Sequence, residues 1–351
     1  MKTGTNRNAS VELLRILMGC AVVVLHYNFI PSGGGAVANA SGFNYYLLML
    51  LESACIVAVN VFMIISGYFS GDKTRLNLAK PVRLLAQLMI FNFIIYLVNA
   101  CVIPGGDGLS LMGIISSLVP ANYYVILYIV VILLSPYLNY MVAKLSDKNF
   151  KQLMMLLVML FLVYATAVDI VEEVMGKSST GLSSIALSGS GAGYTIVNFL
   201  LCYLIGSYLK RCDLKKLSKG GLFVGWAVSL AGVFAWSLLL PSTAWMYSNP
   251  LVMLQAVTLF MLFARKEIKG QWICGLAPAS FSCYLIHGAL LHHIDFEFVQ
   301  TASAWYLICH LFITIVAIYI ISWVAQTIWD LATGKLWKWL GNRGVILAAD
   351  E

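Results

Sequence analysis

The first long apolar stretch of the chain carries two side chains that could do chemistry, Arg15 and His26. They are eleven residues apart, and eleven helical steps of about 100° return to within about 20° of the same face while rising about 16 Å. One helix face would then hold a cationic seat for an anion and, further along, an imidazole that could act as a general base. The structural alternatives are an Arg15 that pairs with Glu12 or reaches to the membrane surface, and a His26 that only bonds to a loop.

Two more polar residues interrupt later apolar stretches. Glu52 is expected near the depth of His26, where a carboxylate could orient an imidazole, and His287 lies near the middle of its stretch. A charged side chain inside a membrane costs about 2.5–3.5 kcal/mol, which makes such residues site candidates. The alternatives are a protonated Glu52 and a buried structural histidine. We take His26, Glu52 and His287 as the candidate catalytic group, and no set of residues with metal-ligand spacing is recognised.

The composition of the chain indicates which elements must position these residues. Of its 351 residues 61% are hydrophobic and 11% are charged, against roughly 45–50% and 25% in a soluble domain. The sequence therefore predicts an all-α, polytopic membrane protein with about ten transmembrane helices. The expected spans are 10–30, 45–69, 79–103, 122–143, 150–170, 193–209, 220–240, 248–264, 275–294 and 304–333.

The basic residues predict the orientation of the chain. Twenty of the 22 lysines and arginines fall at the termini or in alternate loops, and the other loops hold Lys177 together with acidic residues. By the positive-inside rule both termini are cytoplasmic. Because the basic residues form short clusters between apolar stretches, we expect a lipid bilayer and no nucleic acid as partner. One transmembrane domain, 1–343, would be followed by a short cytoplasmic tail, 344–351.

Five ordered patterns resemble those of acyltransferase family 3, the ten-helix bacterial membrane enzymes that O-acylate surface glycans. The first is Glu12-x-x-Arg15 followed by ten residues and His26. The others are Asn60-Val61-Phe62-Met63-Ile64-Ile65-Ser66-Gly67-Tyr68-Phe69, Lys80-Pro81-Val82-Arg83, Tyr123-Tyr124 through Ser135-Pro136, and Ser282-Cys283-Tyr284-Leu285-Ile286-His287. Lys80 replaces the first arginine of the family's basic element, and lysine is a point charge where arginine is a planar fork.

The resemblance implies an activity and its substrates. An acyl-CoA donor, acetyl-CoA in the simplest case, would bind on the cytoplasmic side through Arg15, Arg75, Lys80 and Arg83, with Lys73 nearby. The acceptor would be a hydroxyl of an extracytoplasmic glycan such as an exopolysaccharide, a capsule or a lipid-linked repeat unit. The location would be a bacterial cytoplasmic membrane, with polysaccharide-assembly proteins as further partners. The alternative is a proton-coupled secondary transporter or flippase that uses the same polar residues as a relay.

Overall fold

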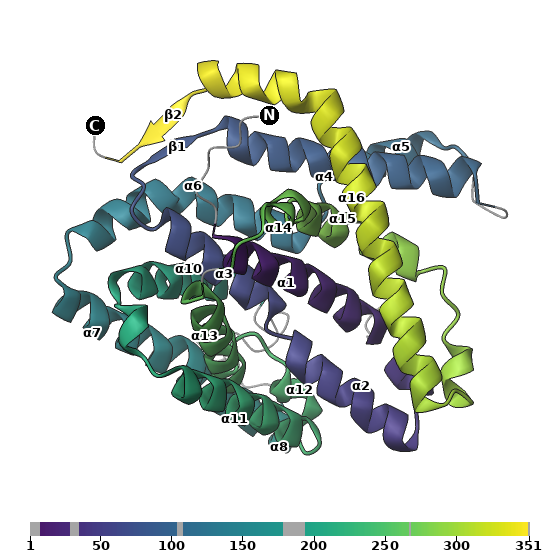
Figure 1. The fold of residues 1–351 in the computed structure, drawn as a ribbon, viewed down its shortest axis with the longest axis horizontal. Coiled ribbons are helices and arrows are strands. Elements are labelled where there is room, and N and C mark those ends of the chain that lie inside the picture. The colour runs from purple at the N-terminus through teal and green to yellow at the C-terminus, as the bar shows by residue number, and fades with distance from the viewer. Residues whose placement is uncertain (1–7, 29–34, 104–107, 178–193, 267, 350–351) are drawn as a thin grey trace.

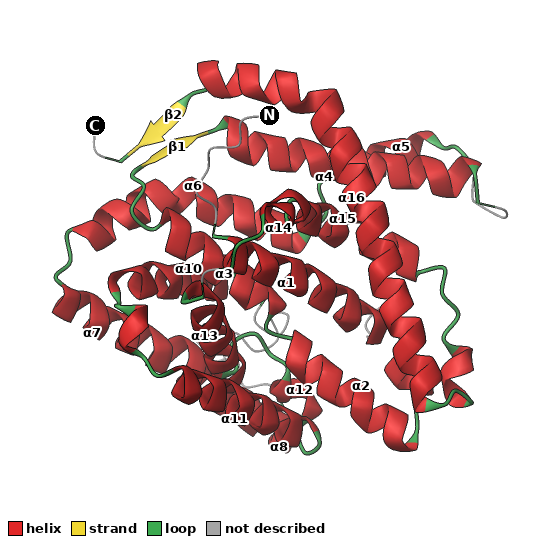
Figure 2. Cartoon of the chain, in the orientation of Figure 1, coloured by secondary structure: helices red, strands yellow, loops and turns green. Residues whose placement is uncertain are grey.

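The computed structural model describes residues 8–28, 35–103, 108–177, 194–266 and 268–349. These residues form helices with two short strands (Figure 2). The elements are α1 (Ala9–Asn28), η1 (Ala36–Asn39), α2 (Gly42–Cys55), α3 (Ala58–Ser70), β1 (Arg75–Asn77), α4 (Ala79–Cys101), α5 (Leu111–Leu118), α6 (Tyr123–Ala143), α7 (Asp147–Val158), η2 (Met159–Tyr164), α8 (Ala165–Met175), α10 (Ile196–Arg211), η3 (Leu214–Lys216), α11 (Lys219–Ser237), α12 (Pro241–Ala244), α13 (Pro250–Ala264), α14 (Gln271–Leu276), α15 (Ala279–Leu291), η4 (Glu297–Gln300), α16 (Ala304–Arg343) and β2 (Ile346–Ala348).

The all-α membrane class predicted from composition agrees with these helices. Within the described ranges, seven helical stretches are long and apolar enough to cross a membrane, and α13 and α15 are shorter apolar helices. The seven are Ala9–Asn28, Gly42–Ser70, Ala79–Cys101, Leu111–Ala143, Asp147–Met175, Lys219–Ser237 and Ala304–Arg343. The number ten and the cytoplasmic termini stay predictions, and Lys2 and Arg7, on which the orientation partly depends, lie outside the described residues.

Three of the expected spans are interrupted. The helix expected over 45–69 is two helices, α2 and α3, separated by Ile56 and Val57. Gln255 of α13 donates its side-chain N–H to the carbonyls of Ser53 and Ala54, at 3.2 and 3.4 Å, just before this break. Backbone that leaves a helix inside a membrane needs such partners. The ranges 150–170 and 275–294 are also divided, by the π-helical η2 and by the turn between α14 and α15.

Polar residues set the first turn of many helices. A serine, threonine or asparagine side chain accepts a hydrogen bond from a backbone N–H of the first turn in seven α-helices of the described chain, which satisfies one of the donors that a helix start leaves unpaired. These caps are Ser110, Asn122, Ser146, Thr195, Ser218, Asn249 and Ser303. Small polar residues between apolar runs therefore define where the helices begin.

Helix α1 runs through the middle of the bundle (Figure 1) and contacts α2, α3, α13, α14, α15 and α16. Its inner residues are packed tightly, and Leu14 and Val23 have no exposed surface. This central position brings the helix of Arg15 and His26 against the helix of Glu52 and the helix of His287.

Helices α3 and α10 cross at the closest approach that glycine allows. A Cβ atom added to Gly67 would lie 1.9 Å from the carbonyl oxygen of Tyr203, and one added to Gly206 would lie 2.2 Å from that of Ile64. Small residues at such crossings let two backbones touch within a membrane. The glycine of the Ser66-Gly67-Tyr68 pattern therefore serves the packing of α3.

Residues Ile346–Ala348, near the end of the chain, form a short strand. Strand β2 pairs antiparallel with β1, with Arg75 opposite Ala348 and Asn77 opposite Ile346. The side chain of Asn77 also donates to the carbonyl of Gly341 at 2.6 Å, at the end of α16. Part of the segment predicted as a short cytoplasmic tail, 344–351, is thus paired with the strand that carries Arg75. Short apolar patterns do not reveal such a long-range pairing.

Candidate active site

His26 and His287 lie in direct contact. Their ring centroids are 4.4 Å apart and the ring planes are inclined by 71°, an edge-to-face arrangement. His287 is 6% exposed, whereas the side chain of His26 is exposed although Leu25 and Tyr27 beside it are buried. His26 is therefore the exposed member of the pair, and the second imidazole forms part of its surroundings.

The hydrogen bonds of the two rings indicate which nitrogen carries the proton. Nδ1 of His26 lies 3.0 Å from the carbonyl oxygen of Val22, and Nδ1 of His287 lies 3.0 Å from that of Cys283. A carbonyl oxygen can only accept, so each Nδ1 is the donor. In a neutral ring Nε2 then has a free lone pair, which is the state that a general base requires.

Glu52 bonds to the end of α1 rather than to His26. Its Oε2 accepts a hydrogen bond of 2.8 Å from the side-chain amide of Asn28, which also donates to the carbonyl of Leu48 at 2.9 Å. Both Asn28 and Glu52 are buried, and no hydrogen bond joins Glu52 to His26 among the described residues. The carboxylate therefore ties α2 to the last turn of α1, two residues beyond His26.

Arg15 pairs with Glu12 within α1. Its guanidinium lies 3.3 Å from a carboxylate oxygen of Glu12, and the side chain remains 35% exposed. This is the pair that the sequence offered as a structural alternative. Because the Arg15 side chain keeps exposed surface, an anion can still reach its other N–H groups.

The basic element at the other end of the bundle is partly paired. Arg83 donates to Asp330 of α16 at 2.5 Å, with side chains 37% and 45% exposed. Lys73 and Lys80 are exposed, and neither makes an ion pair within the described part of the chain. Arg75 is exposed on β1. Nearby, the Lys210 ammonium bonded to Asp72 at 2.6 Å lowers the pKa of that carboxyl below its ordinary value. The exposed ammonium groups of Lys73 and Lys80, between the end of α3 and the start of α4, are thus available to phosphates.

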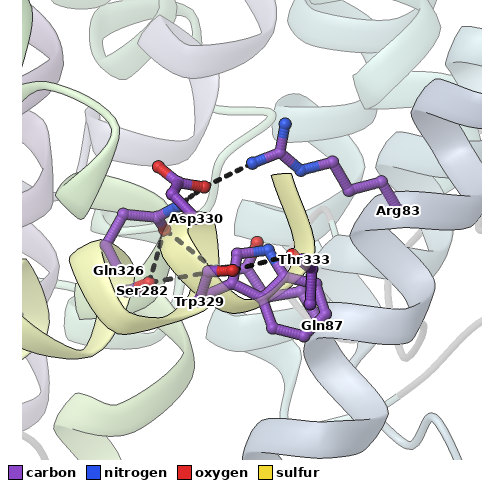
Figure 3. A network of polar contacts seen from close by, with 7 residues as sticks. All are labelled: Arg83, Gln87, Ser282, Gln326, Trp329, Asp330 and Thr333. Carbon is purple, nitrogen blue, oxygen red and sulfur yellow. Dashed lines mark hydrogen bonds and ion pairs between the residues drawn. The ribbon is translucent and has the colours of Figure 1, made fainter. Parts of the chain in front are cut away.

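A buried polar network connects this element to the helix of His287 (Figure 3). Gln87 of α4 donates to Ser282 of α15 at 3.0 Å and to Gln326 of α16 at 2.9 Å, and Ser282 donates to Gln326 at 2.6 Å. Gln326 donates in turn to Asp330 at 3.0 Å, the carboxylate that holds Arg83. The network therefore sets where α15 lies against α4 and α16, five residues before His287.

A group of tyrosines lies beside α15. The rings of Tyr284 and Tyr124 are tilted by 49° with 4.8 Å between centroids, and Tyr284 lies 5.8 Å from the ring of His287. Tyr194 contacts both Tyr123 and Tyr247, at 4.5 and 4.7 Å. These residues come from α6, α15 and the segments before α10 and α13, so an aromatic wall with hydroxyl groups stands beside the histidine pair.

Sequence reasoning missed several of these residues. Asn28, Gln87, Gln326 and Asp330 are uncharged or lie near span ends, so the search for charges and histidines inside apolar stretches passed over them. Their signal was nevertheless present, because each is a polar side chain in or beside an expected span. The described residues contain no cluster of three or more potential metal ligands.

Comparison with known families shows to which family the chain belongs. Residues 8–326 match the model of the acyltransferase domain of acyltransferase family 3. The match covers nearly the whole chain and includes His26, Glu52 and His287. No curated protein and no solved structure gives a significant match. The chain belongs to acyltransferase family 3, and family membership implies an acyltransferase activity.

Proposed function

We propose that the protein transfers an acetyl group from acetyl-CoA to a hydroxyl of a glycan on the opposite side of the membrane. The observation that carries the proposal is the histidine pair, in which an exposed His26 has Nε2 free to take a proton. An O-acyl transfer needs such a base at the acceptor hydroxyl. Family membership implies the class of reaction, acyl transfer. The free Nε2 of His26 supports a hydroxyl as the acceptor of the acyl group.

The donor would bind at the basic element. Lys73, Arg75 and Lys80 would meet the phosphates, and Arg83 would join them by sharing or leaving its bond to Asp330. The thin pantetheine arm would follow α1 past Arg15 toward His26, about 16 Å further along the helix. The thioester carbonyl would then lie beside the exposed imidazole.

In the chemical step, His26 would act as the general base. As the hydroxyl oxygen of the acceptor attacks the thioester carbon, Nε2 of His26 takes the hydroxyl proton. The C–S bond then breaks, and the imidazolium returns the proton to the leaving CoA sulfur. His287 is a second polar group beside the reacting atoms, and Glu52 holds the end of α1 through Asn28. Tyr123 and Tyr194, the exposed members of the tyrosine group, would offer flat faces and hydroxyls to a sugar.

The charge distribution supports the same direction of transfer. Both termini would be cytoplasmic, in a ten-helix arrangement within a bacterial cytoplasmic membrane, because the basic clusters would then all be inside. The acyl-CoA pool would meet the basic element, and the glycan would meet the histidines. Polysaccharide-assembly proteins would supply that glycan.

One experiment separates this function from proton-coupled transport or flipping. Purified protein is given labelled acetyl-CoA and bacterial surface glycans, and the glycans are analysed for acetyl ester mass shifts. The same preparation in liposomes is tested for pH-driven uptake of the glycan. Ester formation that depends on the protein supports the proposal, whereas uptake without ester formation contradicts it.

A further inference from the structure

Gly288 follows His287 in helix α15 and faces open space. A Cβ atom added to Gly288 would meet no atom of another segment of the described chain within 4 Å. The residue is exposed, whereas every residue from Ser282 to His287 is buried. Room for a side chain is therefore present next to the histidine pair, and the sequence places no side chain in it.

Neither the backbone nor the packing of α15 requires a glycine at this position. The described glycines with a positive φ angle are Gly42, Gly108 and Gly176, so other residues can adopt the helical conformation of Gly288. A Cβ at Gly67 would collide with the backbone of α10, whereas one at Gly288 would collide with nothing described. Glycine inside a helix is destabilising relative to alanine. Close approach of a ligand to the backbone is a further reason for a glycine.

The open space lies on the side of α15 opposite the apolar groove that this helix forms with α4 and α16. Ile286 lines that groove, and two helical steps of about 100° place Gly288 about 200° round the helix from it. Tyr284, four residues before Gly288, is within about 40° of the same face. The ring of Tyr284 contacts Tyr124 of α6. Gly288 therefore faces toward α6, within the bundle.

Aromatic and polar groups surround this space. Tyr284 lies one helical turn before Gly288, and its hydroxyl donates to the side chain of Asn122 at 3.2 Å. His292 lies one turn after Gly288 on the same face and is exposed. The exposed ring of His26 contacts His287, the residue next to Gly288. A ring with hydroxyl groups could thus lie on the bare backbone, between an aromatic and an imidazole side chain.

We propose that Gly288 determines the size of the acceptor that can present its hydroxyl to His26. The proposal rests on the proposed acyl transfer and adds to it a residue that selects among acceptors. Helix α15 ends at Leu291, and in the proposed orientation that end is extracytoplasmic, so Gly288 lies one residue beyond His287 on the side of acceptor entry. The donor would reach His26 from the opposite direction. A side chain at this position would therefore obstruct the acceptor and not the donor.

The first test compares a large and a small acceptor with the full-length protein in lipid nanodiscs. Labelled acetyl-CoA is offered together with the glycan or with glycerol. In Gly288→Leu we expect kcat/KM for the glycan to fall about 10–200-fold, with the KM for acetyl-CoA unchanged and transfer to glycerol near the wild-type rate. Gly288→Ala should show a smaller loss of the same kind, and its thermal stability should equal or exceed that of the wild type.

Gly275→Leu is the matched control. Gly275 of α14 is also exposed, and a Cβ there has nothing described within 4 Å. This variant should keep the wild-type ratio of glycan transfer to glycerol transfer. Equal losses with both acceptors in Gly288→Leu, or the same change of ratio in Gly275→Leu, would overturn the inference. If Gly288→Leu fails to fold, which thermal unfolding would detect, Gly288→Ala supplies the ratio.

The second test needs no acyl donor and no turnover. In Gly288→Cys the new thiol is modified with N-ethylmaleimide, and mass spectrometry follows the modified peptide. We expect the glycan to slow this modification and acetyl-CoA to leave it unchanged, while the exposed Cys101 reacts equally in all samples. Absence of protection by the glycan would contradict the inference. Protection without any acetyl transfer by the wild type would contradict the proposed function, whereas transfer without protection would contradict this inference alone.

Discussion

Nδ1 of His26 and Nδ1 of His287 each bond to the carbonyl four residues earlier in its own helix, and the two rings meet edge to face at 4.4 Å. The backbone thereby selects the same tautomer in both rings. It leaves both Nε2 atoms to the surroundings, and the exposed one belongs to His26. The contact joins helices α1 and α15, and the first prediction below depends on it.

His26→Ala should lower acetyl transfer by about 10²–10⁴-fold, because the acceptor hydroxyl loses its general base. Donor affinity should remain near that of the wild type, since Arg15, the donor-side cation of the same helix, lies about 16 Å away along α1. Steady-state transfer and equilibrium binding of acetyl-CoA measure the two quantities. Wild-type turnover in this variant would exclude His26 as the base.

Glu52→Ala and Asn28→Ala should each reduce turnover, and the double variant should lose no more than the worse single one, because both residues hold one contact at the end of α1. Glu52→Gln keeps an oxygen that accepts from Asn28, so it should retain most of the activity. A loss in Glu52→Gln as large as in Glu52→Ala would show instead that the carboxylate charge acts on His26.

Arg83→Ala should raise the KM for acetyl-CoA, whereas Asp330→Ala should leave it unchanged or lower it, because that change frees the guanidinium for phosphate. Exposed ion pairs are worth about 0–1 kcal/mol, so neither variant should unfold the protein. The KM at low and at high salt is the measurement. If both variants raise the KM equally, Arg83 serves only to bind Asp330.

Gln87→Leu should lower the turnover number more than it changes the KM for acetyl-CoA, since the side chain fixes α15 and does not touch the donor element. Single interhelical hydrogen bonds in membranes contribute about 0.6 kcal/mol on average, so the helices should stay assembled. Gln87→Asn, which keeps an amide N–H donor, should recover part of the turnover. A change in KM alone would contradict this positioning role.

Gly67→Ala should lower the thermal stability strongly, because the new methyl group would lie 1.9 Å from a backbone oxygen of α10 and the helices must separate. Overpacking of this kind costs about 1–3 kcal/mol. Gly334→Ala is the matched control, since a Cβ there has nothing within 4 Å. Equal melting temperatures of the detergent-solubilised variants would contradict the close crossing.

The sequence by itself determined the helical membrane class, the shared face of Arg15 and His26, the candidate role of His287 and the family. Each of these follows from hydropathy, helical periodicity or ordered short patterns, which are local properties of the chain. The tertiary structure decided which polar groups are partners. Asn28 forms a hydrogen bond with Glu52, and Arg83 forms one with Asp330, 247 residues further along the chain. Strand β2 pairs with β1. A buried polar group bonds to whatever donor or acceptor packing brings within about 3 Å, and that neighbour depends on how distant helices cross rather than on nearby sequence.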